Sequence, residues 1–312
     1  MKITFLPLRH LAVAGAVALF LAGAGRASAQ TLYVSSDDNT IQQISQGGTR
    51  TIFADATAGL NTPYGIAFDA TGNLFVANNG NSTIVRLTPG GVASPFADST
   101  NLSFPTGIAF DSAGNLFAAN SGGGTITSFA ADGTATAFAA SGASGTSFPF
   151  GLAFNASGTL FASNLNDNTI VRFTSGGIAS LFADANLNSP NGIAFDALGN
   201  LYAANFGDGT IAKFTPEGVG SIFASGLNNP SGLAFDPAGN LYVANYGDGT
   251  IEKFTTTGVG SLFASGLTNP EFLAFGPAGV AVPEPSTWLG SLGMLGLFGG
   301  SLYRRRHRTR VA

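Results

Sequence analysis

The sequence Pro-Ser-Gly-Leu-Ala-Phe-Asp at residues 230–236 decides the fold, because the unit that it opens returns along the chain. The unit continues with Gly-Asn-Leu-Tyr-Val-Ala-Asn at 239–245, Gly-Thr-Ile-Glu-Lys-Phe at 249–254 and Gly-Ser-Leu-Phe-Ala at 260–264. Each run is rich in β-branched, aromatic and small apolar residues, and Gly, Asn, Asp and Pro separate the runs. One unit is therefore expected to form a four-stranded antiparallel sheet.

The opening phrase, Pro-x-Gly-(Ile/Leu)-Ala-Phe, occurs six times. It starts at Pro63, Pro105, Pro149, Pro190, Pro230 and Pro270. The spacings are 42, 44, 41, 40 and 40 residues, and Phe272 replaces the glycine in the last copy. A four-stranded sheet of this size cannot bury both faces alone, so the repeat predicts radial stacking into an all-β propeller.

The two ends of the repeat region predict how the ring closes. Residues 32–36, 40–44 and 51–55 match the second, third and fourth strands of a unit, but no first strand precedes them. The missing strand appears at the other end, as residues 271–275. Five complete units and this composite give six blades, and the pairing of the two ends leaves no long open edge.

Charge and composition exclude several classes of function. Residues 31–281 contain 5 Lys and Arg against 16 Asp and Glu, a net charge of 5 − 16 = −11, which argues against nucleic-acid binding. The chain has no cysteine, and its two histidines, His10 and His307, lie outside this region. Ser-His and Cys-His nucleophile pairs are thereby excluded, and zinc or copper sites are not expected.

The N-terminus predicts export. Lys2 and Arg9 precede an apolar run over residues 11–25, and Ala27-Ser28-Ala29 offers small residues for cleavage. Residues 1–29 are therefore expected to be a signal peptide, and Gln30 to be the first mature residue. Residues 30–281 are then the propeller domain.

Residues 282–312 have the organisation of a membrane-sorting tail. Pro283-Glu284-Pro285 is followed by an uncharged, mostly apolar stretch over 286–303, near the lower limit for spanning a bilayer. Five arginines follow and favour a cytoplasmic C-terminus: Arg304, Arg305, Arg306, Arg308 and Arg310.

This tail resembles the PEP-CTERM sorting signal of Gram-negative bacteria. The resemblance implies a membrane-embedded exosortase as processing partner, acting near the Pro-Glu-Pro element. It also implies an intermediate anchored in the inner membrane by a transmembrane helix, then display at the cell surface or release into the extracellular matrix.

The repeated phrases Gly-Asn-Leu-(Phe/Tyr)-(Val/Ala)-Ala-Asn and Gly-Thr-Ile-x-(Lys/Arg)-Phe resemble NHL-type repeats over nearly all of residues 31–281. The likeness implies a propeller and leaves the activity open, because this fold carries unrelated functions. One departure concerns the end of the second strand, where many NHL repeats carry Asp. Asn stands there in this chain: Asn78, Asn120, Asn164, Asn205 and Asn245.

Residues that recur in every unit are interpreted as structural. The phenylalanines that end the first strands are expected to pack between blades. They are Phe68, Phe110, Phe154, Phe195, Phe235 and Phe275. Four Asp residues, each separated by two residues from a Gly-Asn pair, are expected to bond the backbone of a tight turn: Asp69, Asp111, Asp196 and Asp236.

Residues that differ between units are the candidate ligand-binding site. In propellers the residue after each opening proline rings the channel mouth, which here gives Tyr64, Thr106, Phe150, Asn191, Ser231 and Glu271. Aromatic side chains fall on one arc and polar ones on the other, as in a surface for a small ligand or a polymer. The alternative is that these side chains only fill the mouth.

Two weaker hypotheses concern metals. Turn chemistry is the favoured explanation of the Asn-x-Gly-Asp-Gly-Thr segments, which lack the full spacing of a helix-loop-helix calcium site. Their Asp208 and Asp248 side chains could still bind Ca²⁺ or another divalent metal in an oxygen-rich loop. The phrase at 190–195 also resembles six-bladed gluconolactonases, which implies a central metal held by four ligands. Glu271 and Asn191 match two of the four. Streptogramin lyases share the repeat, but they employ a histidine that residues 31–281 lack.

The sequence thus predicts an exported six-bladed propeller that acts as a binding module, linked to exopolysaccharide or the biofilm matrix, with extracellular polysaccharide or a surface protein as its partner. The alternative is a metal-dependent, gluconolactonase-like hydrolase that uses the channel mouth.

Overall fold

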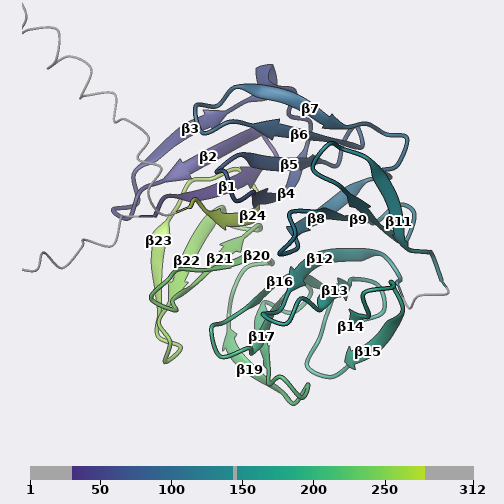
Figure 1. Cartoon of the computed structure of the whole chain (residues 1–312). Helices are drawn as coiled ribbons and strands as arrows, with labels where there is room; N and C mark the ends of the chain where they lie inside the picture. Colours follow the sequence, from purple (N-terminus) through teal and green to yellow (C-terminus); the bar gives the residue numbers. More distant parts are fainter. Residues whose placement is uncertain (1–29, 143–145, 278–312) are drawn as a thin grey trace, which may run out of the picture.

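The computed structural model describes residues 30–142 and 146–277, which form 24 β-strands and one 3₁₀ helix. The predicted signal peptide and sorting tail lie outside the described residues. Among the residues described, no helix is long and apolar enough to cross a membrane. The strands make six four-stranded antiparallel sheets arranged around a central axis (Figure 1), so the predicted six-bladed β-propeller is confirmed.

The composite blade contains β24 (Pro270–Phe275), β1 (Leu32–Ser36), β2 (Thr40–Ile44) and β3 (Arg50–Ala54), followed by η1 (Ala56–Ala58). The second blade contains β4 (Pro63–Phe68), β5 (Leu74–Asn78), β6 (Thr83–Leu87) and β7 (Ala93–Ala97). The third contains β8 (Pro105–Phe110), β9 (Leu116–Asn120), β10 (Thr125–Phe129) and β11 (Ala135–Ala139).

The fourth blade contains β12 (Pro149–Phe154), β13 (Leu160–Asn164), β14 (Thr169–Phe173) and β15 (Ala179–Ala183). The fifth contains β16 (Pro190–Phe195), β17 (Leu201–Asn205), β18 (Thr210–Phe214) and β19 (Gly220–Ser225). The sixth contains β20 (Pro230–Phe235), β21 (Leu241–Asn245), β22 (Thr250–Phe254) and β23 (Gly260–Ala264).

The ring closes as the sequence predicts. β1 pairs antiparallel with β24, with Leu32 opposite Phe275 and Val34 opposite Leu273. The two ends of the propeller therefore share one sheet. The Gly276 N–H also donates a hydrogen bond of 2.9 Å to the Thr31 carbonyl, next to the paired residues. β1 is thus paired on both sides, with β24 and with β2, and has no open edge.

Strand register defines two ends of each sheet. In the second blade Pro63 lies opposite Asn78, and Asn78 lies opposite Thr83, so the start of the first strand and the end of the second meet. We call this the mouth end, since the residues after the opening prolines lie there. The loops between second and third strands, and those that lead to the next blade, are the mouth loops.

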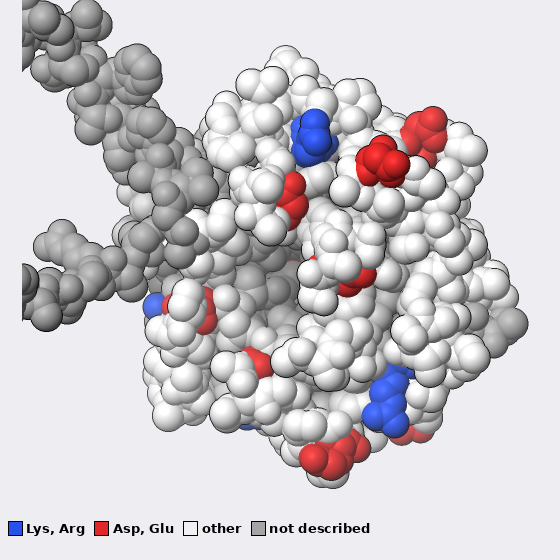
Figure 2. Space-filling model, viewed as in Figure 1, with Lys and Arg blue, Asp and Glu red and all other residues white. Residues whose placement is uncertain are grey.

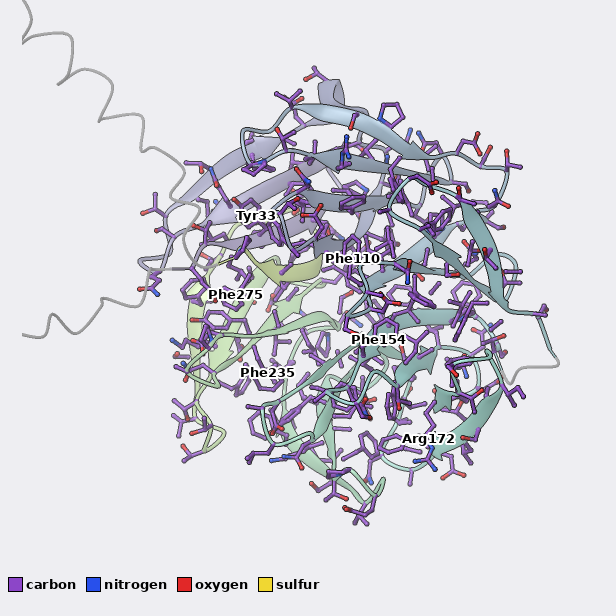
Figure 3. All side chains as sticks on the ribbon, viewed as in Figure 1. Tyr33, Phe110, Phe154, Arg172, Phe235 and Phe275 are labelled. Atoms are coloured by element: carbon purple, nitrogen blue, oxygen red, sulfur yellow. The ribbon has the colours of Figure 1, made fainter. Side chains whose placement is uncertain are left out.

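Aromatic side chains join neighbouring blades in the same way around the whole ring. The aromatic residue of each second strand meets the Phe of its own fourth strand and the Phe that ends the first strand of the next blade. Tyr202, for example, makes edge contacts with Phe223 and Phe235 at centroid distances of 5.1 and 5.0 Å. Phe110, Phe154, Phe235 and Phe275 surround the centre in Figure 3. Their expected packing role is confirmed, and each pair contributes about 0.5–1.5 kcal/mol beyond burial.

The turn chemistry also follows the sequence. Asp236 accepts hydrogen bonds from the backbone N–H and side-chain amide of Asn240, at 2.8 and 2.7 Å. Gly239 between them has φ +82°, a value that glycine adopts without steric cost.

Hydrogen bonds to the mouth loops explain why Asn, and not the Asp of many NHL repeats, ends the second strands. Asn78 accepts from the Asn61 N–H and donates to the Thr83 hydroxyl and to the Gly59 carbonyl, at 3.1, 3.1 and 2.9 Å. A carboxylate could not donate the last bond, because an ionised Asp only accepts. The amide thus ties the loop that enters a blade to the second strand of that blade.

The glycine of the opening phrase lets the first strands approach closely. A Cβ atom on Gly151 would collide with the carbonyl oxygen of Asn191 in the next blade, and four other copies show the same contact. Backbone atoms cannot turn aside as a flexible side chain can, so the ring requires glycine here.

We therefore expect Gly151→Ala to lower the free energy of unfolding by at least about 2 kcal/mol, because the added methyl group overpacks a backbone contact. Urea unfolding monitored by circular dichroism measures the change. Gly176→Ala is the matched control, since the nearest atom to a Cβ there is the Thr174 hydroxyl at 3.9 Å. Equal stability of the two variants would contradict the argument.

Candidate functional site

The six predicted ring residues lie at the mouth end, each one position into a first strand. Tyr64 is half-buried, and the other five are at most 6% exposed. Three of them, Asn191, Ser231 and Glu271, form a hydrogen-bonded chain, and the other three line one cavity. We call this chain, together with the neighbouring Asp37, the polar arc.

The polar arc is built on three consecutive blades. The Asn191 side-chain amide donates to the Ser231 hydroxyl at 3.4 Å, and that hydroxyl donates to Glu271 Oε2 at 2.7 Å. Burial raises the pKa of Glu271 to about 8, and the negative charge of Asp37 adds to this effect. Hydrogen bonds from Ser231 and Tyr64 oppose the increase. At neutral pH the Glu271 carboxyl is thus largely protonated.

Asp37 is a site residue that the sequence reasoning missed. Its Oδ2 accepts from the Tyr246 hydroxyl at 2.9 Å, and burial raises its pKa, with the neighbouring charge of Asp38 adding to the shift. The signal was available, because Asp37 directly follows a second strand. The equivalent residues differ between blades as much as the ring does: Asp37, Asn79, Ser121, Leu165, Phe206 and Tyr246.

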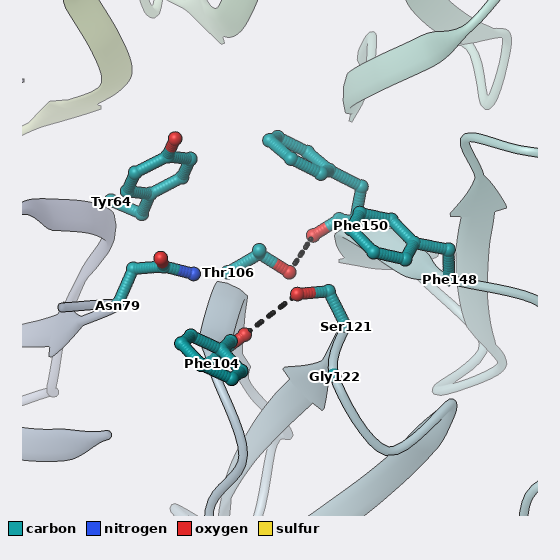
Figure 4. A pocket seen from close by; sticks show the side chains of 8 residues that line it. All are labelled: Tyr64, Asn79, Phe104, Thr106, Ser121, Gly122, Phe148 and Phe150. Carbon is teal, nitrogen blue, oxygen red and sulfur yellow. Dashed lines mark hydrogen bonds between the residues drawn. The ribbon is translucent and has the colours of Figure 1, made fainter. Parts of the chain in front are cut away.

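The other three ring residues open onto a cavity of about 450 Å³. It is lined by Tyr64, Asn79, Phe104, Thr106, Ser121, Gly122, Phe148 and Phe150, as Figure 4 shows. The rings of Tyr64 and Phe150 meet edge-on with centroids 5.8 Å apart. Phe272, which stands where other blades have glycine, stacks on Phe150 at 5.9 Å.

Two aromatic residues of this cavity also escaped the sequence reasoning. Phe104 and Phe148 each precede an opening proline, and their exposed fractions are 53% and 37%. We call Tyr64, Phe104, Phe148 and Phe150 the aromatic arc. Its two exposed rings stand on mouth loops, while Tyr64 and Phe150 stand on the first strands β4 and β12.

The backbone at Phe104 and Phe148 is left-handed, with φ +48° and +57°. The equivalent positions in the other blades share this conformation: Thr62, Ser189, Asn229 and Asn269. Small polar residues, above all Asn, tolerate it, whereas a bulky aromatic residue there is strained. Strain of this kind, about 1–3 kcal/mol for each residue, is concentrated at functional sites.

The weaker metal candidates do not join the ring carboxylate. Asp208 and Asp248 are exposed, and each accepts hydrogen bonds from the threonine two residues later, at 2.7 Å from Thr210 and 2.6 Å from Thr250. Within residues 30–142 and 146–277, no group of three His, Cys, Asp or Glu side chains is placed to hold a metal ion. Glu271 and Asn191, the two ligands expected from the gluconolactonase resemblance, lie in one hydrogen-bonded chain. Two other ring positions offer a metal less: the Thr106 hydroxyl already donates to the Phe150 carbonyl, and the Phe150 side chain has no ligand atom.

Two known protein-family models match this sequence. Residues 24–254 match the virginiamycin B lyase family, and residues 281–306 match the PEP-CTERM protein-sorting motif. No curated protein sequence matches the chain.

Solved structures match the propeller at low sequence identity. One chain of a nidogen/laminin complex has a TM-score of 0.71 at 20% identity, over 80% of this chain and 98% of that one. A catalytically inactive His→Ala variant of Staphylococcus aureus virginiamycin B lyase, solved with quinupristin, has a TM-score of 0.58 at 18% identity, over 67% and 73%. A Xanthomonas campestris gluconolactonase has a TM-score of 0.59 at 21% identity, over 70% and 84%. These likenesses show the fold.

The raised pKa of Glu271 predicts how stability depends on pH. The folded protein binds the proton of Glu271 more tightly than the unfolded chain does. The stability that this provides is complete below the unfolded pKa of about 4.5 and is lost as the pH rises through about 8. We expect the free energy of unfolding to fall by up to about 1.4 kcal/mol for each pH unit within this window.

Glu271→Gln removes the titrating group and keeps an acceptor for Ser231, so the variant should lose most of this decrease. Urea unfolding of both proteins at about pH 5 and about pH 8.5 measures the difference. A parent protein whose stability is flat across the window would contradict the assignment.

Proposed function

Since the chain belongs to the virginiamycin B lyase family and carries a PEP-CTERM motif that marks it for export and surface sorting, we propose that it is a surface binding module. Its ligand is a segment of extracellular polysaccharide, held at the channel mouth. An exosortase recognises the tail, and the propeller is then displayed at the surface or released into the matrix.

The aromatic cavity carries this proposal. Ligand sites in proteins are concave, mostly apolar, and carry a few polar groups that fix orientation. The C–H face of a sugar ring packs on an aromatic ring, while its hydroxyl groups bond to amide and hydroxyl side chains. The cavity offers both kinds of partner, in the aromatic arc and in Asn79 and Ser121.

The strained loop conformation supports the same conclusion. Asn would fit the left-handed backbone at residues 104 and 148 better than Phe, as Asn229 and Asn269 do in other blades. Two exposed rings are kept at a cost in stability, and neither is in one of the aromatic pairs that join neighbouring blades among the described residues. A binding role explains that cost.

The sequence also argues against the lyase reaction in this member of the family. The inactive S. aureus variant lacks one histidine, and no histidine stands anywhere in residues 30–277 of this chain. The nidogen/laminin match is one chain of a protein complex, which is consistent with a propeller used for binding.

We expect Phe104→Asn and Phe148→Asn to reduce binding of oligosaccharides by about tenfold or more, about 1.4 kcal/mol, because the rings that contact the ligand are lost. The free energy of unfolding should stay unchanged or rise by up to about 1 kcal/mol, since Asn relieves the backbone strain. Calorimetric titration with cello-, xylo- and chito-oligosaccharides measures affinity, and thermal unfolding measures stability.

Leu198→Asn is the matched control, since it removes an apolar side chain that is 82% exposed in a loop at the opposite end of the sheets. Its affinity should equal that of the parent. Asn variants at 104 and 148 that are destabilised yet bind normally would show that the rings serve folding instead.

A second candidate function is a metal-dependent, lactonase-like hydrolase. One observation favours it: Asn191 Oδ1 is buried without a hydrogen-bond partner and lies in the chain that leads to Glu271. These two residues supply two of the four ligands that the gluconolactonase resemblance implies, and the remaining ring residues supply no further carboxylate.

Calorimetric titration of Ca²⁺ and Mn²⁺ into the metal-stripped protein tests this candidate. The binding-module proposal predicts no tight site, and Glu271→Gln should leave any weak binding unchanged. One tight site that the substitution abolishes would instead favour the hydrolase, and screening of lactones would follow.

A further inference from the structure

Four buried side-chain atoms lack a hydrogen-bond partner among the described residues, and all four are oxygens at the mouth end. They are Ser36 Oγ, Asp37 Oδ1, Asn191 Oδ1 and Asn245 Oδ1. They belong to three consecutive blades, the fifth, the sixth and the composite one. Carboxylate and amide oxygens only accept hydrogen bonds, so three of these atoms need a donor. An unsatisfied buried acceptor is costly, which makes a donor-rich ligand favourable here.

Charge is divided unequally between the two ends of the sheets. The mouth loops hold eight carboxylates: Asp37, Asp38, Asp55, Asp98, Asp167, Asp184, Asp208 and Asp248. Glu271 on β24 is a ninth acidic group, but it is largely protonated at neutral pH. No Lys or Arg stands in any mouth loop.

The five basic residues of the propeller lie at the opposite ends of the third and fourth strands: Arg50, Arg86, Arg172, Lys213 and Lys253. Figure 2 shows the end of the propeller opposite to the mouth, where basic residues (blue) lie among acidic ones (red). Arg172 is labelled in the same view in Figure 3. Among the described basic residues, only Arg50 donates a hydrogen bond to a mouth loop, to the Gly266 carbonyl at 2.6 Å.

Because the mouth loops carry acidic side chains and no basic ones, the mouth end attracts cations.

The aromatic and polar arcs meet at Tyr64. Burial, together with the charge of Glu271, raises the pKa of Tyr64, while its ring meets the ring of Phe150 edge-on. A cation above an aromatic ring is attracted by about 0.5–2 kcal/mol. A group bound at this junction thus finds acceptors on one side and aromatic faces on the other.

From these features we propose that the ligand is a saccharide chain with free amino groups, whose ammonium sits on the polar arc while the attached sugar packs on the aromatic arc. The inference rests on the proposed function and specifies its ligand class. An ammonium group supplies three donors and a positive charge, which suits the unpartnered oxygens of Asp37 and Asn191. A metal ion would gain nothing from the aromatic rings, and a neutral sugar would gain nothing from the acidic mouth loops.

The test compares a β-1,4-linked glucosamine hexamer with its fully N-acetylated counterpart in calorimetric titrations of the purified protein. The two chains share ring and linkage and differ in the amino group, so we expect the glucosamine chain to bind at least about tenfold more tightly. Asp37→Asn keeps an acceptor for Tyr246 and removes one charge, and it should remove most of that difference.

Glu217→Gln is the charge-matched control, because Glu217 is exposed in a loop at the opposite end. It should leave the preference intact, and Phe104→Asn should weaken both hexamers. Equal binding of the two hexamers would overturn this inference and leave the polysaccharide proposal standing. Binding of neither would overturn both. A preference that Asp37→Asn and Glu217→Gln reduce equally would mean unspecific attraction to an acidic protein and would also overturn the inference.

Discussion

The contact between neighbouring first strands is the constraint on which the rest of the molecule depends. At Gly65, Gly107, Gly151, Gly192 and Gly232 the backbone of one blade approaches the backbone of the next too closely for any side chain. This contact sets the radius of the ring, and it holds the residue before each glycine at the mouth. The ring positions are therefore rigid in the backbone and free to vary in the side chain, which is the condition that a designed or evolved binding site needs.

The site arises where the repeat is broken. Phe272 occupies the one glycine position that lacks glycine, and its ring stacks on Phe150. Phe104 and Phe148 replace the small residues that suit a left-handed backbone, and Asp37 follows the one second strand that ends in Ser instead of Asn. Each exception costs local stability or removes a recurrent contact. Their gathering at one end of the ring is the strongest sign that this end is functional.

The fold could be predicted from the sequence because each strand of the repeat occurs in six copies, and every copy supports the same strand assignment. The closure by β24 and β1 followed from one missing strand, and the ring residues followed from their place after a proline. Asp37 could have been found in the same way, from its place directly after a second strand. Phe104 and Phe148 could not, because their roles depend on the conformation of the loops. A left-handed backbone before proline contradicts the usual preference of that position for extended structure. Burial of the Glu271 carboxyl likewise depends on packing across three blades.

Closure and the site are physically linked. Glu271 enters from the last strand of the propeller and Asp37 follows the first, so the polar arc exists only when the two ends of the chain share a sheet. A ligand that bridges Asp37 and Asn191 binds the closed ring and not the open one, and it stabilises closure by its own binding free energy. In a protein without disulfides this matters, because the pairing of β1 with β24 is the contact that holds the ring shut. A surface module of this kind would be most resistant to unfolding while it holds its ligand.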